Sequence, residues 1–553
     1  MVEHEKTLVA LREVVGAEYL LAQPAVLRDY ATATFAHHNR VRAVVLPSSL
    51  EEVQRLIEVA NQHRLHLHPV SRGRNWGLGS RVPVSDGNIV VDLARMNRIC
   101  DFNEELGFVT VEPGVTFRQL ADYLAARGSQ LYAAVIGGPP DASLIGNALE
   151  RGDGLGPLGE RSDQCCALEA VDGRGELLRT GLQPYGSELL SKLWSPGVGP
   201  SLQGLLMQSN FAIVTRMTIW LARKPDAFQG VCFAVSDTKV LPQLTAAMRR
   251  LQFDGVLKPN SYALWNPYKL LASLMQYPWT EGGRPYTTPQ QLLSHLPRGF
   301  RKAEWIGMAG LYSVDEAHAR AERRLLRKAI SKYTSQLVVF NRRTVKMIRP
   351  VRGLLAKLGG MDPELLIRLL YTHSPFLGHP TEFSTASTYW RKHTARPAVM
   401  HPDRDRCGLH WVCTVLPFDG DQIRRHAALI EETALAHDLE PNISYLNASP
   451  RLLKCFAVIA FDRDSDDEER RARACHDEML QRLMVAGYPP IRLGVQSMKA
   501  GLPRDPAYAS VIRRLKNVFD PNRVIAPGHY DFQSPEQPEQ PEHFWQTLPG
   551  TDR

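Results

Sequence analysis

Ser71-Arg-Gly-Arg-Asn-Trp-Gly-Leu-Gly-Ser80 is a glycine-rich segment that directly follows a predicted β-strand at Leu65 to Val70. Three glycines within seven residues permit a tight turn, because glycine adopts positive φ angles at little energetic cost. Backbone amides in such a turn can point toward an anion. The segment therefore predicts a loop that cradles phosphate groups.

The residues before this loop predict a strand, a helix and a second strand. Val41 to Pro47 is apolar and β-branched, which favours a strand. Ser48 and Ser49 each precede a glutamate by three positions, the capping-box pattern of a helix start. Apolar residues then recur at helical spacing at Leu50, Val53, Leu56, Ile57 and Ala60. One face of this helix is expected to pack on a sheet.

A second glycine-rich segment lies further along the same part of the chain. It comprises Gly137-Gly-Pro-Pro140, Ile145-Gly-Asn147 and Arg151-Gly-Asp-Gly-Leu-Gly156. Two such loops in one domain indicate a ligand with two phosphate groups. Strands are predicted at residues 89–93, 108–111, 167–171, 177–180 and 213–221, and a helix at 116–126.

Length and charge narrow the function classes. The chain has 553 residues, which predicts two or more domains sharing a cleft. Its formal charge of +8 is spread along the chain without a Lys/Arg block, which argues against a nucleic-acid partner. Neither a signal-peptide pattern nor an apolar window of about 18 residues occurs, so we expect a cytoplasmic protein without a membrane partner.

The eight cysteines form no CxxC pair or regular framework. This pattern favours free thiols over disulfides, and we predict no metal site. Cys165 and Cys166 lie in a predicted buried strand, where core packing is favoured over a nucleophilic role.

The rest of the chain predicts a second, α+β domain and a separate C-terminal segment. Helices are expected at residues 317–330 and 422–437, and a strand at 408–416. A further helix ends at Phe519 and is followed by Asp520-Pro-Asn-Arg-Val-Ile-Ala-Pro-Gly528. The Pro/Glu/Gln-rich residues beyond Ser534 are typical of a flexible tail.

Four motifs, taken together and in this order, resemble the vanillyl-alcohol oxidase and p-cresol methylhydroxylase family of FAD-dependent oxidoreductases. They are Arg72-Gly-Arg-Asn-Trp-Gly, Val111-Glu-Pro-Gly-Val-Thr, Gly146-Asn with Glu150-Arg-Gly, and Asp520-Pro-Asn with Ala526-Pro-Gly. The resemblance is strongest over residues 41–224 and returns in the C-terminal motif, while the middle third matches loosely.

The resemblance implies an α+β fold with a two-lobed FAD-binding domain of the p-cresol methylhydroxylase type. The implied parts are an N-terminal helical segment at 1–40, the FAD-binding domain at 41–224, a substrate or cap domain at 225–500, a C-terminal segment at 501–533 that returns to the FAD domain, and a flexible tail at 534–553. In this fold no GxGxxG motif is required.

The resemblance also implies the residues that bind FAD. They are Pro69, Ser71, Arg72, Gly73, Arg74, Asn75, Trp76, Gly77, Leu78, Gly79, Ser80, Pro113, Gly114, Gly137, Gly138, Pro139, Ile145, Gly146, Asn147, Arg151, Gly152, Gly154, Ile213, Val214 and Arg523. We expect the flavin to be held without a covalent bond, with a link through Tyr389 or His410 as the alternative.

The implied reaction passes a hydride from an alcohol, benzylic or otherwise activated carbon of a small organic substrate to flavin N5. Molecular oxygen or an electron-carrier protein is the implied acceptor, and the protein is expected to form a homodimer. Phenol oxidisers of the family hold a phenolate between two tyrosines and an arginine, whereas the matching positions here are Leu78, Ile491 and Arg492. A larger, more apolar substrate than a simple p-alkylphenol is therefore expected.

Three residues are catalytic candidates, each with an alternative. Arg492 either binds an anionic group or stabilises the reduced flavin, or is an ordinary ion-pairing residue. His410 is an active-site base, a flavin link or a packed strand histidine. Asp141 is a base or a charge partner of the flavin, or it caps the following helix.

Two other functions are consistent with the same motifs. One is a flavoprotein of this fold that uses the flavin to assist bond formation, and the other is a non-catalytic flavin-binding protein. Oxygen consumption and flavin reduction by a substrate distinguish the three.

Overall fold

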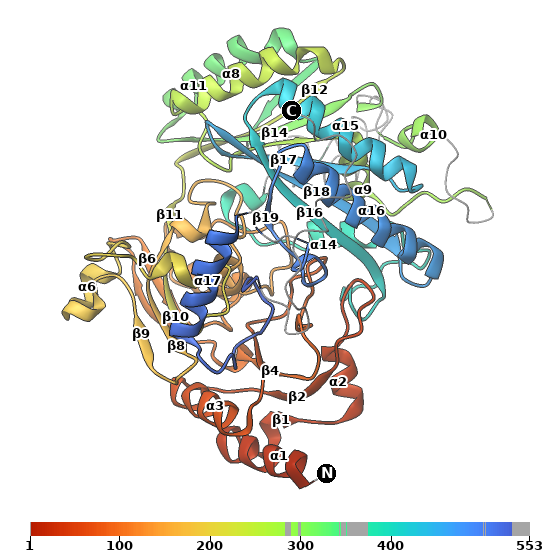
Figure 1. Cartoon of the computed structure of the whole chain (residues 1–553). Coiled ribbons are helices and arrows are strands. Elements are labelled where there is room, and N and C mark those ends of the chain that lie inside the picture. Colours follow the sequence, from red (N-terminus) through yellow and green to blue (C-terminus); the bar gives the residue numbers. More distant parts are fainter. Residues whose placement is uncertain are drawn as a thin grey trace.

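The computed structural model describes residues 2–281, 289–296, 300–341, 343, 350, 374–500, 503 and 505–532. The expected tail at 534–553 lies outside the described residues, as do 501, 502, 504 and 533 of the expected C-terminal segment. The described chain is α+β, as predicted (Figure 1). Residues 20–223 form sheets of four, five and two strands, and residues 227–492 form one large sheet.

The first sheet contains the strand that leads into the first glycine-rich loop. Its order is β1 (Leu20–Leu21), β2 (Val41–Val45), β4 (Asn88–Asp92), β3 (Leu67–Val70), and β2, β4 and β3 are parallel. Helix α3 (Leu50–His63) connects β2 to β3 and buries the predicted apolar face. The Ser49 hydroxyl accepts from the Glu52 amide at 3.2 Å, so the helix begins where the capping box predicts.

The N-terminal residues pack around this sheet. Helix α1 (Val2–Val15) lies against α3, and α2 (Pro24–Tyr30) lies beside β2. The expected helical segment thus contains α1 and α2, but it also contains the short strand β1, and residues 31–40 are not helical.

The chain returns to the same sheet near its C-terminal end. Helix α17 (Pro506–Phe519) is followed by residues that run beside β3, where the Leu67 amide donates to the Val524 carbonyl and the Ala526 amide to the Leu67 carbonyl, both at 2.7 Å. The fully buried Lys516 ammonium pairs with the Asp520 carboxylate at 2.6 Å and fastens this return.

The second sheet is antiparallel and carries the second glycine-rich loop. Its order is β5 (Ile99–Asn103), β6 (Phe108–Val111), β10 (Ala212–Trp220), β8 (Cys165–Asp172), β9 (Leu177–Arg179). Helices α4 (Phe117–Ala126) and α5 (Leu144–Leu149) contribute to its core. Cys165 and Cys166 are buried in β8, and all eight cysteines are unpaired. Short strands β7 (Leu131–Tyr132) and β11 (Ala222–Arg223) pair at the exit to the third sheet.

The third sheet has eight strands, and every neighbouring pair is antiparallel. Its order is β15 (Gln336–Phe340), β12 (Ala227–Val235), β14 (Trp305–Ser313), β13 (Tyr262–Trp265), β17 (Asn442–Ser449), β18 (Leu452–Asp462), β16 (Cys407–Pro417), β19 (Pro490–Arg492). Helices α8 (Leu241–Phe253), α11 (Glu316–Ile330), α15 (Gly420–Ala436) and α16 (Asp466–Val485) cover one face (Figure 1).

The two faces of this sheet have different neighbours because side chains alternate along a strand. Leu264 and Val412 lie in the core beneath the four helices. The adjacent Ala263 and Trp411 face the other way and line a cavity. Helix α9 (Pro267–Leu274) lies at this second face beside β13 and β17.

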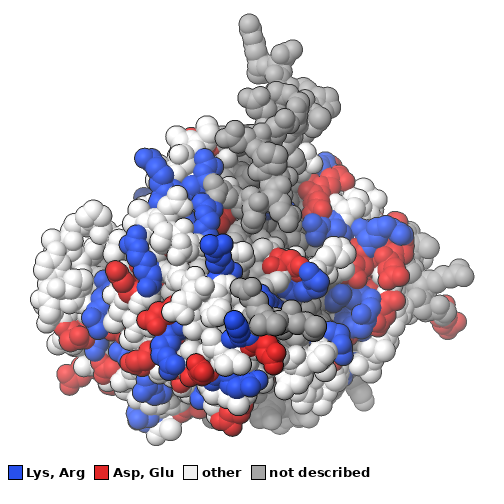
Figure 2. All heavy atoms as spheres, turned by 60° about the horizontal axis from the view of Figure 1, so that its bottom comes forward, with Lys and Arg blue, Asp and Glu red and all other residues white. Residues whose placement is uncertain are grey.

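Basic and acidic side chains alternate on the molecular face shown in Figure 2. None of the helices in the described part of the chain is long and apolar enough to cross a membrane.

Candidate active site

A cavity of about 440 Å³ extends from the two glycine-rich loops to the inner face of the large sheet. Most of the predicted cofactor and substrate residues line it. They are Pro69, Ser71, Arg72, Gly73, Arg74, Asn75, Trp76, Leu78, Gly79, Ser80, Gly137, Gly138, Pro139, Gly146, Asn147, Arg151, Ile213, Val214, Ile491 and Arg492. Residues from four separate segments of the sequence therefore meet at one site.

The first loop is a tight turn whose geometry requires glycine at two cavity-lining positions. Gly73 has φ +59° and Gly79 has φ +129°, both in the region that side chains disfavour. Leu78 and Ser80 both donate their amides to the Asn75 carbonyl at 3.1 Å, which closes the turn. The backbone of the loop can therefore approach a ligand closely at these two positions.

A buried carboxylate fixes this loop to the C-terminal half of the chain. Asp403 accepts hydrogen bonds from the Ser80 hydroxyl at 2.9 Å and from the Trp76 indole at 3.1 Å. Burial raises the pKa of Asp403 to about 7, against the lowering effect of these donors and of Arg81. The sequence reasoning missed Asp403, because nothing in its local sequence links it to residues some 320 positions earlier.

The second loop leads into the short helix α5. Ser143 caps this helix by accepting from the Gly146 amide at 3.0 Å, and its hydroxyl donates to the Pro113 carbonyl at 2.6 Å. A Cβ on Gly146 would lie 3.3 Å from the Ser71 hydroxyl oxygen, so the two loops approach each other closely here.

Several predicted cofactor residues support the loops without lining the cavity. Gly114 packs against the carbonyls of Ala94 and Met96, and Ile145 lies in the core of the second sheet. Gly152 packs on Asn147, and Gly154 packs on Arg161 and Ala134.

Gly77 and Arg523 also lie away from the cavity lining, as does Pro113. The Gly77 amide donates to the Thr34 hydroxyl at 2.9 Å, so the expected approach of this amide to a phosphate is corrected. Arg523 donates to the Asn517 side chain at 3.1 Å on an exposed part of the surface. Pro113 contributes its carbonyl as the acceptor for Ser143.

The chemistry of the lining fits a dinucleotide such as FAD. Arg72, Arg74 and Arg151 supply positive charge at the loops, where a pyrophosphate needs it. The loop backbones lack the Cβ atoms that would block a close approach. Among the described residues no partner hydrogen-bonds to His68 Nδ1, His529 Nδ1 or Arg492 Nε, although all three atoms are buried. Buried polar atoms without partners at a cavity wall are suited to a polar ligand.

Arg492 lies at the junction of the loops and the large sheet. It donates to the Asn75 side-chain oxygen at 2.9 Å, and its Nε lies 3.8 Å from the Glu150 carboxylate. Glu150 also pairs with His529 at 3.1 Å. Burial acts to raise the pKa of Glu150, but His529 and Arg492 outweigh it and the pKa is lowered. Arg492 therefore both lines the cavity and belongs to an ion-pair network.

His410 points away from the cavity. Its neighbours Leu409 and Trp411 in β16 line the cavity, and alternation turns His410 to the opposite face. There its ring stacks on Phe35 at 4.9 Å and lies 5.0 Å from the ring of His476. Burial lowers the pKa of His410 well below the ordinary histidine value. This is the arrangement of a packed, neutral strand histidine, and it corrects the expectation of a base or flavin link.

Asp141 does not line the cavity either. Its half-exposed carboxylate pairs with Arg118 on α4 at 3.0 Å. The cap of the following helix is Ser143 rather than Asp141. Both functional readings of Asp141, and the capping reading, are therefore replaced by a surface ion pair.

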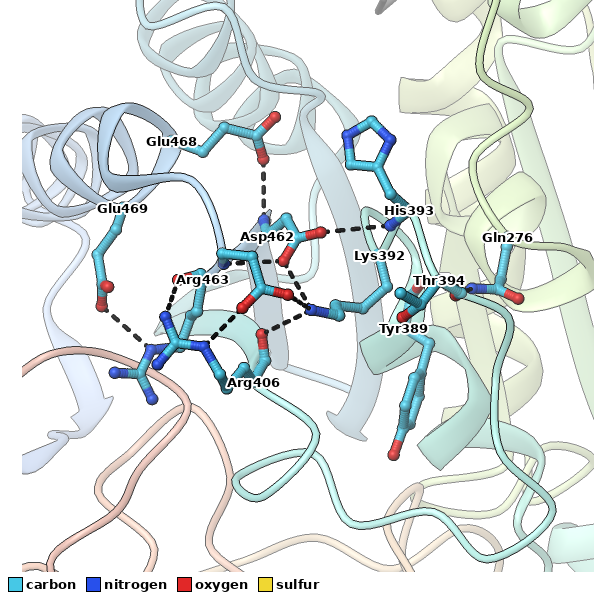
Figure 3. Close-up of polar contacts among 11 residues, drawn as sticks. Gln276, Tyr389, Lys392, His393, Thr394, Arg406, Asp462, Arg463, Glu468 and Glu469 are labelled. Carbon is cyan, nitrogen blue, oxygen red and sulfur yellow. Dashed lines mark hydrogen bonds and ion pairs between the residues drawn. The ribbon is translucent and has the colours of Figure 1, made fainter. Parts of the chain in front are cut away.

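Tyr389 is fixed in a polar cluster beside the cavity wall. Its hydroxyl donates to Asp405 and accepts from the His401 amide. Figure 3 shows Lys392, three residues further on, paired with Asp462 at 2.8 Å. This buried pairing anchors the segment whose earlier residues, including Phe383 and Thr388, line the cavity. The Tyr389 hydroxyl is thereby engaged outside the lining.

The end of the cavity formed by the large sheet is mainly apolar. Its walls include Ala263, Trp265, Met308, Phe376, Phe383, Leu409, Trp411, Phe456 and Val458. Leu78 and Ile491, at the positions where a phenol oxidiser has tyrosines, also line the cavity. One charged side chain that the sequence reasoning missed, Lys269 of α9, lies in the same lining. It is the only charged residue in the stretch 261–280, and that isolation is the signal that could have identified it.

Comparisons with known proteins agree with this site. Residues 41–181 match a family model described as an FAD binding domain. A protein of Chondromyces crocatus named 1'-carboxy-chondrochloren decarboxylase is 40% identical, covering 96% of this chain and 97% of that protein. The hydroxylating 4-cresol dehydrogenase flavoprotein subunit of Pseudomonas putida is 25% identical, covering 95% of each chain.

The solved structures include the same fold. The crystal structure of p-cresol methylhydroxylase with substrate bound superposes with a TM-score of 0.84 at 23% identity, covering 96% of this chain and 98% of that chain. FAD is accordingly the cofactor of this site. With a relative 40% identical over nearly its whole length, this chain belongs to the vanillyl-alcohol oxidase and p-cresol methylhydroxylase family of FAD-dependent oxidoreductases.

Proposed function

We propose that this chain takes a hydride from an alcohol, benzylic or otherwise activated carbon of an apolar organic substrate held at the large-sheet end of the cavity. The observation that carries the proposal is that one continuous cavity joins the predicted cofactor loops to the large sheet. The glycine-rich loops and the apolar inner face of the sheet line the same cavity of about 440 Å³. A cofactor at the loops and a substrate at the sheet would therefore lie in contact.

Bound FAD supplies the two-electron, hydride-accepting chemistry that side chains lack. The chain's own residues bind the cofactor, orient the substrate and exclude water. The loops around Gly73, Gly79 and Gly146 hold the phosphates, and the apolar lining keeps solvent from the reacting carbon. Arg492, at the junction, supplies positive charge where negative charge develops during hydride transfer.

The pocket chemistry favours a substrate other than a simple phenol. A phenolate held by Arg492 would lack the two hydroxyl donors that Leu78 and Ile491 cannot supply. Each charge-assisted hydrogen bond of this kind contributes about 1.5–3 kcal/mol. A p-alkylphenol should therefore bind weakly, and a larger apolar molecule should bind better.

A second candidate is oxidative decarboxylation, favoured by the name of the Chondromyces crocatus relative. In that reaction a carboxylate adjacent to the reacting carbon leaves as CO₂. The electron pair of the broken C–COO⁻ bond forms a C=C bond to the reacting carbon, which gives up hydride. The carboxylate substrate thus yields CO₂, an alkene and a hydride, and the charge of −1 is conserved. Bound FAD would accept two electrons in both candidates, and release of CO₂ separates them.

Anaerobic reduction of the purified holoenzyme tests the proposal. A panel of alcohols, substituted phenols and aryl-substituted acids is mixed with the protein, and loss of flavin absorbance is followed by stopped flow. We expect apolar alcohols or activated methylene compounds to bleach the flavin faster than p-cresol does. Rapid bleaching by p-cresol, or a preparation that binds no flavin, would contradict the proposal.

The acceptor and assembly belong to the same proposal. Reoxidation by molecular oxygen would appear as oxygen consumption, whereas an electron-carrier acceptor would require an added mediator. The expected homodimer and cytoplasmic location stay predictions, which size-exclusion chromatography and cell fractionation test.

A further inference from the structure

Lys269 is a lone cation in an apolar helix. Helix α9 begins after Asn266, whose side chain accepts from the Lys269 amide at 3.0 Å, with Pro267 in the first turn. The helix buries Leu270, Leu271 and Leu274 in a hydrophobic cluster. A charge on such a helix is costly unless it reaches solvent or a partner.

The Lys269 side chain lines the cavity and does not form an ion pair with any described residue. Its ammonium lies 5.6 Å from the centre of the Trp265 ring, a cation–π distance. Burial without a counter-charge lowers the pKa of Lys269 to about 8.

Three buried lysines of the described chain have a carboxylate partner that the partly buried Lys269 lacks. Lys392 pairs with Asp462 at 2.8 Å (Figure 3), Lys454 with Asp153 at 2.6 Å and Lys516 with Asp520 at 2.6 Å. In each case the fold supplies a carboxylate to a desolvated ammonium. For Lys269 the described residues supply an aromatic face and an open cavity.

The acids in the same cavity wall are already committed to other cations. Among the described lining residues these acids are Glu150 and Asp153. Glu150 lies 3.8 Å from the Arg492 guanidinium, and Asp153 pairs with Lys454 at 2.6 Å. Their charges are therefore compensated locally, and the positive charge of Lys269 is left facing the cavity.

The apolar cavity walls indicate which kind of ligand could bind beside Lys269. Ala263, Met308 and Val458 surround this end of the cavity with hydrocarbon. A ligand that satisfies both features has an apolar body and one anionic group. An anion with its charge on oxygen binds an ammonium better than an anion with delocalised charge does, because a charge-assisted N–H···O⁻ hydrogen bond is short and strong.

We propose that Lys269 binds a carboxylate of the substrate, so that the substrate class is an apolar organic acid. This inference rests on the proposed function, which places the substrate at the large-sheet end of the cavity. Binding precedes both hydride transfer alone and oxidative decarboxylation, so the role of Lys269 is the same in either reaction.

Calorimetric titration of the FAD-loaded protein with matched probes tests the inference. The probes are 4-phenylbutyrate and its neutral analogue 4-phenylbutanamide. We expect the acid to bind native protein at least about 10-fold more tightly than the amide, as a buried charge-assisted pair should give. Equal binding of the two probes would overturn the inference.

Substitution of Lys269 separates its charge from the shape of the cavity. Lys269→Met removes the charge while keeping an unbranched side chain, and it should abolish the preference for the acid while leaving binding of the amide unchanged. Lys269→Arg should retain a preference for the acid. Lys328→Met, an exposed lysine of α11, is the matched control and should behave as native protein. An acid preference that persists in Lys269→Met would overturn the inference.

A second readout shows that the methionine variant is folded. Without ligand, Lys269→Met should melt at a higher temperature than native protein, because an ammonium without a counter-charge has been removed. Addition of 4-phenylbutyrate should raise the melting temperature of native protein but not that of Lys269→Met. If no substrate reduces the flavin, the proposed function fails while the binding comparison still decides the role of Lys269. If acid and amide bind equally while substrates still reduce the flavin, only the role of Lys269 fails.

Discussion

The backbone amide of Gly77 donates a hydrogen bond to the hydroxyl of Thr34 at 2.9 Å. Gly77 also accepts from the Trp411 amide at 3.3 Å through its carbonyl. The tip of the first glycine-rich loop is therefore tied to the N-terminal segment on one side and to β16 on the other. Gly77 therefore allows these elements to pack closely, and its neighbours Trp76 and Leu78 line the cavity.

Gly77→Val should destabilise the fold itself. The residue has φ +78°, and a Cβ would lie 2.0 Å from a ring carbon of Trp411. Backbone strain of this kind costs about 1–3 kcal/mol before the displacement of the ring is added. We expect a lower melting temperature in the apoprotein. A normal apoprotein melting temperature combined with loss of FAD would instead restore a direct role for Gly77 at the phosphates.

Gly137→Val should weaken FAD binding without unfolding the protein. A Cβ at Gly137 would meet only the Ser384 hydroxyl oxygen, at 3.6 Å, so the protein itself leaves room for a side chain facing the cavity. Valine would occupy space that the cofactor needs, and FAD affinity should fall by roughly 10-fold or more. Equilibrium dialysis with FAD measures this. Gly204→Val is the control, because that exposed position has no atom within 4 Å of its Cβ and does not line the cavity. Equal FAD affinity in the two variants would contradict the placement of the cofactor.

Arg492→Met should slow reduction of the flavin while leaving FAD bound. Arg492 contacts the first loop only through the Asn75 side chain, whereas the turn is closed by the Asn75 carbonyl, so the loop should keep its shape. The charge of Arg492 lies at the junction with the substrate end. Loss of a donor that stabilises developing charge typically costs about 10²-fold in rate. Single-turnover anaerobic reduction measures the effect, with Arg492→Lys as the charge-conserving comparison. Unchanged reduction kinetics in Arg492→Met would leave Arg492 as a structural partner of Glu150.

Acid precipitation should release FAD into the supernatant. The two residues considered for a covalent link are engaged elsewhere, since His410 faces away from the cavity and the Tyr389 hydroxyl is held by Asp405. Absorbance of the supernatant and of the pellet measures the split. Flavin retained in the pellet would point to a nucleophile of the lining, and peptide mapping would test Cys413, Tyr445 and His68 first.

His426 should contribute a measurable pH dependence to stability. It is buried between the hydroxyls of Thr414 and Tyr445, and burial lowers its pKa to about 3. Below about pH 6.5 the unfolded chain takes up a proton that the folded chain does not, so the native protein loses up to about 1.4 kcal/mol per pH unit through this group. His426→Gln lacks this loss, and its stability relative to native protein should improve as the pH falls from 7 to 5. Melting temperatures of both proteins across this range measure it, and parallel pH profiles would contradict the prediction.

The N-terminal half of the fold was predictable because its signals are local. Ser49 and Glu52 are three residues apart, and the glycines of the first loop follow directly on their strand. Such patterns report backbone conformation independently of distant contacts. Most of the residues predicted in the two loops accordingly line the cavity, although Gly77, Gly152 and Gly154 do not.

The large sheet and the orientation of His410 were not predictable in the same way. Its strands pair across long separations, such as β13 with β17, and several are buried on both faces, so they show no alternation of polar and apolar residues. A histidine in such a strand has no sequence signal for the face it occupies. Glu150 with His529, and Asp403 with Ser80, are joined only by the folded chain.

The return of the C-terminal residues to β3 sets an order of events in biosynthesis. Ile525, Ala526 and His529 line the cavity, yet they are among the last described residues to be made. A nascent chain that has reached residue 500 already has both glycine-rich loops but lacks this wall. Because synthesis proceeds from the N-terminus at about 5–20 residues per second, both loops are made well before the residues that complete the cavity wall. The complete cavity is therefore available to FAD only late in synthesis.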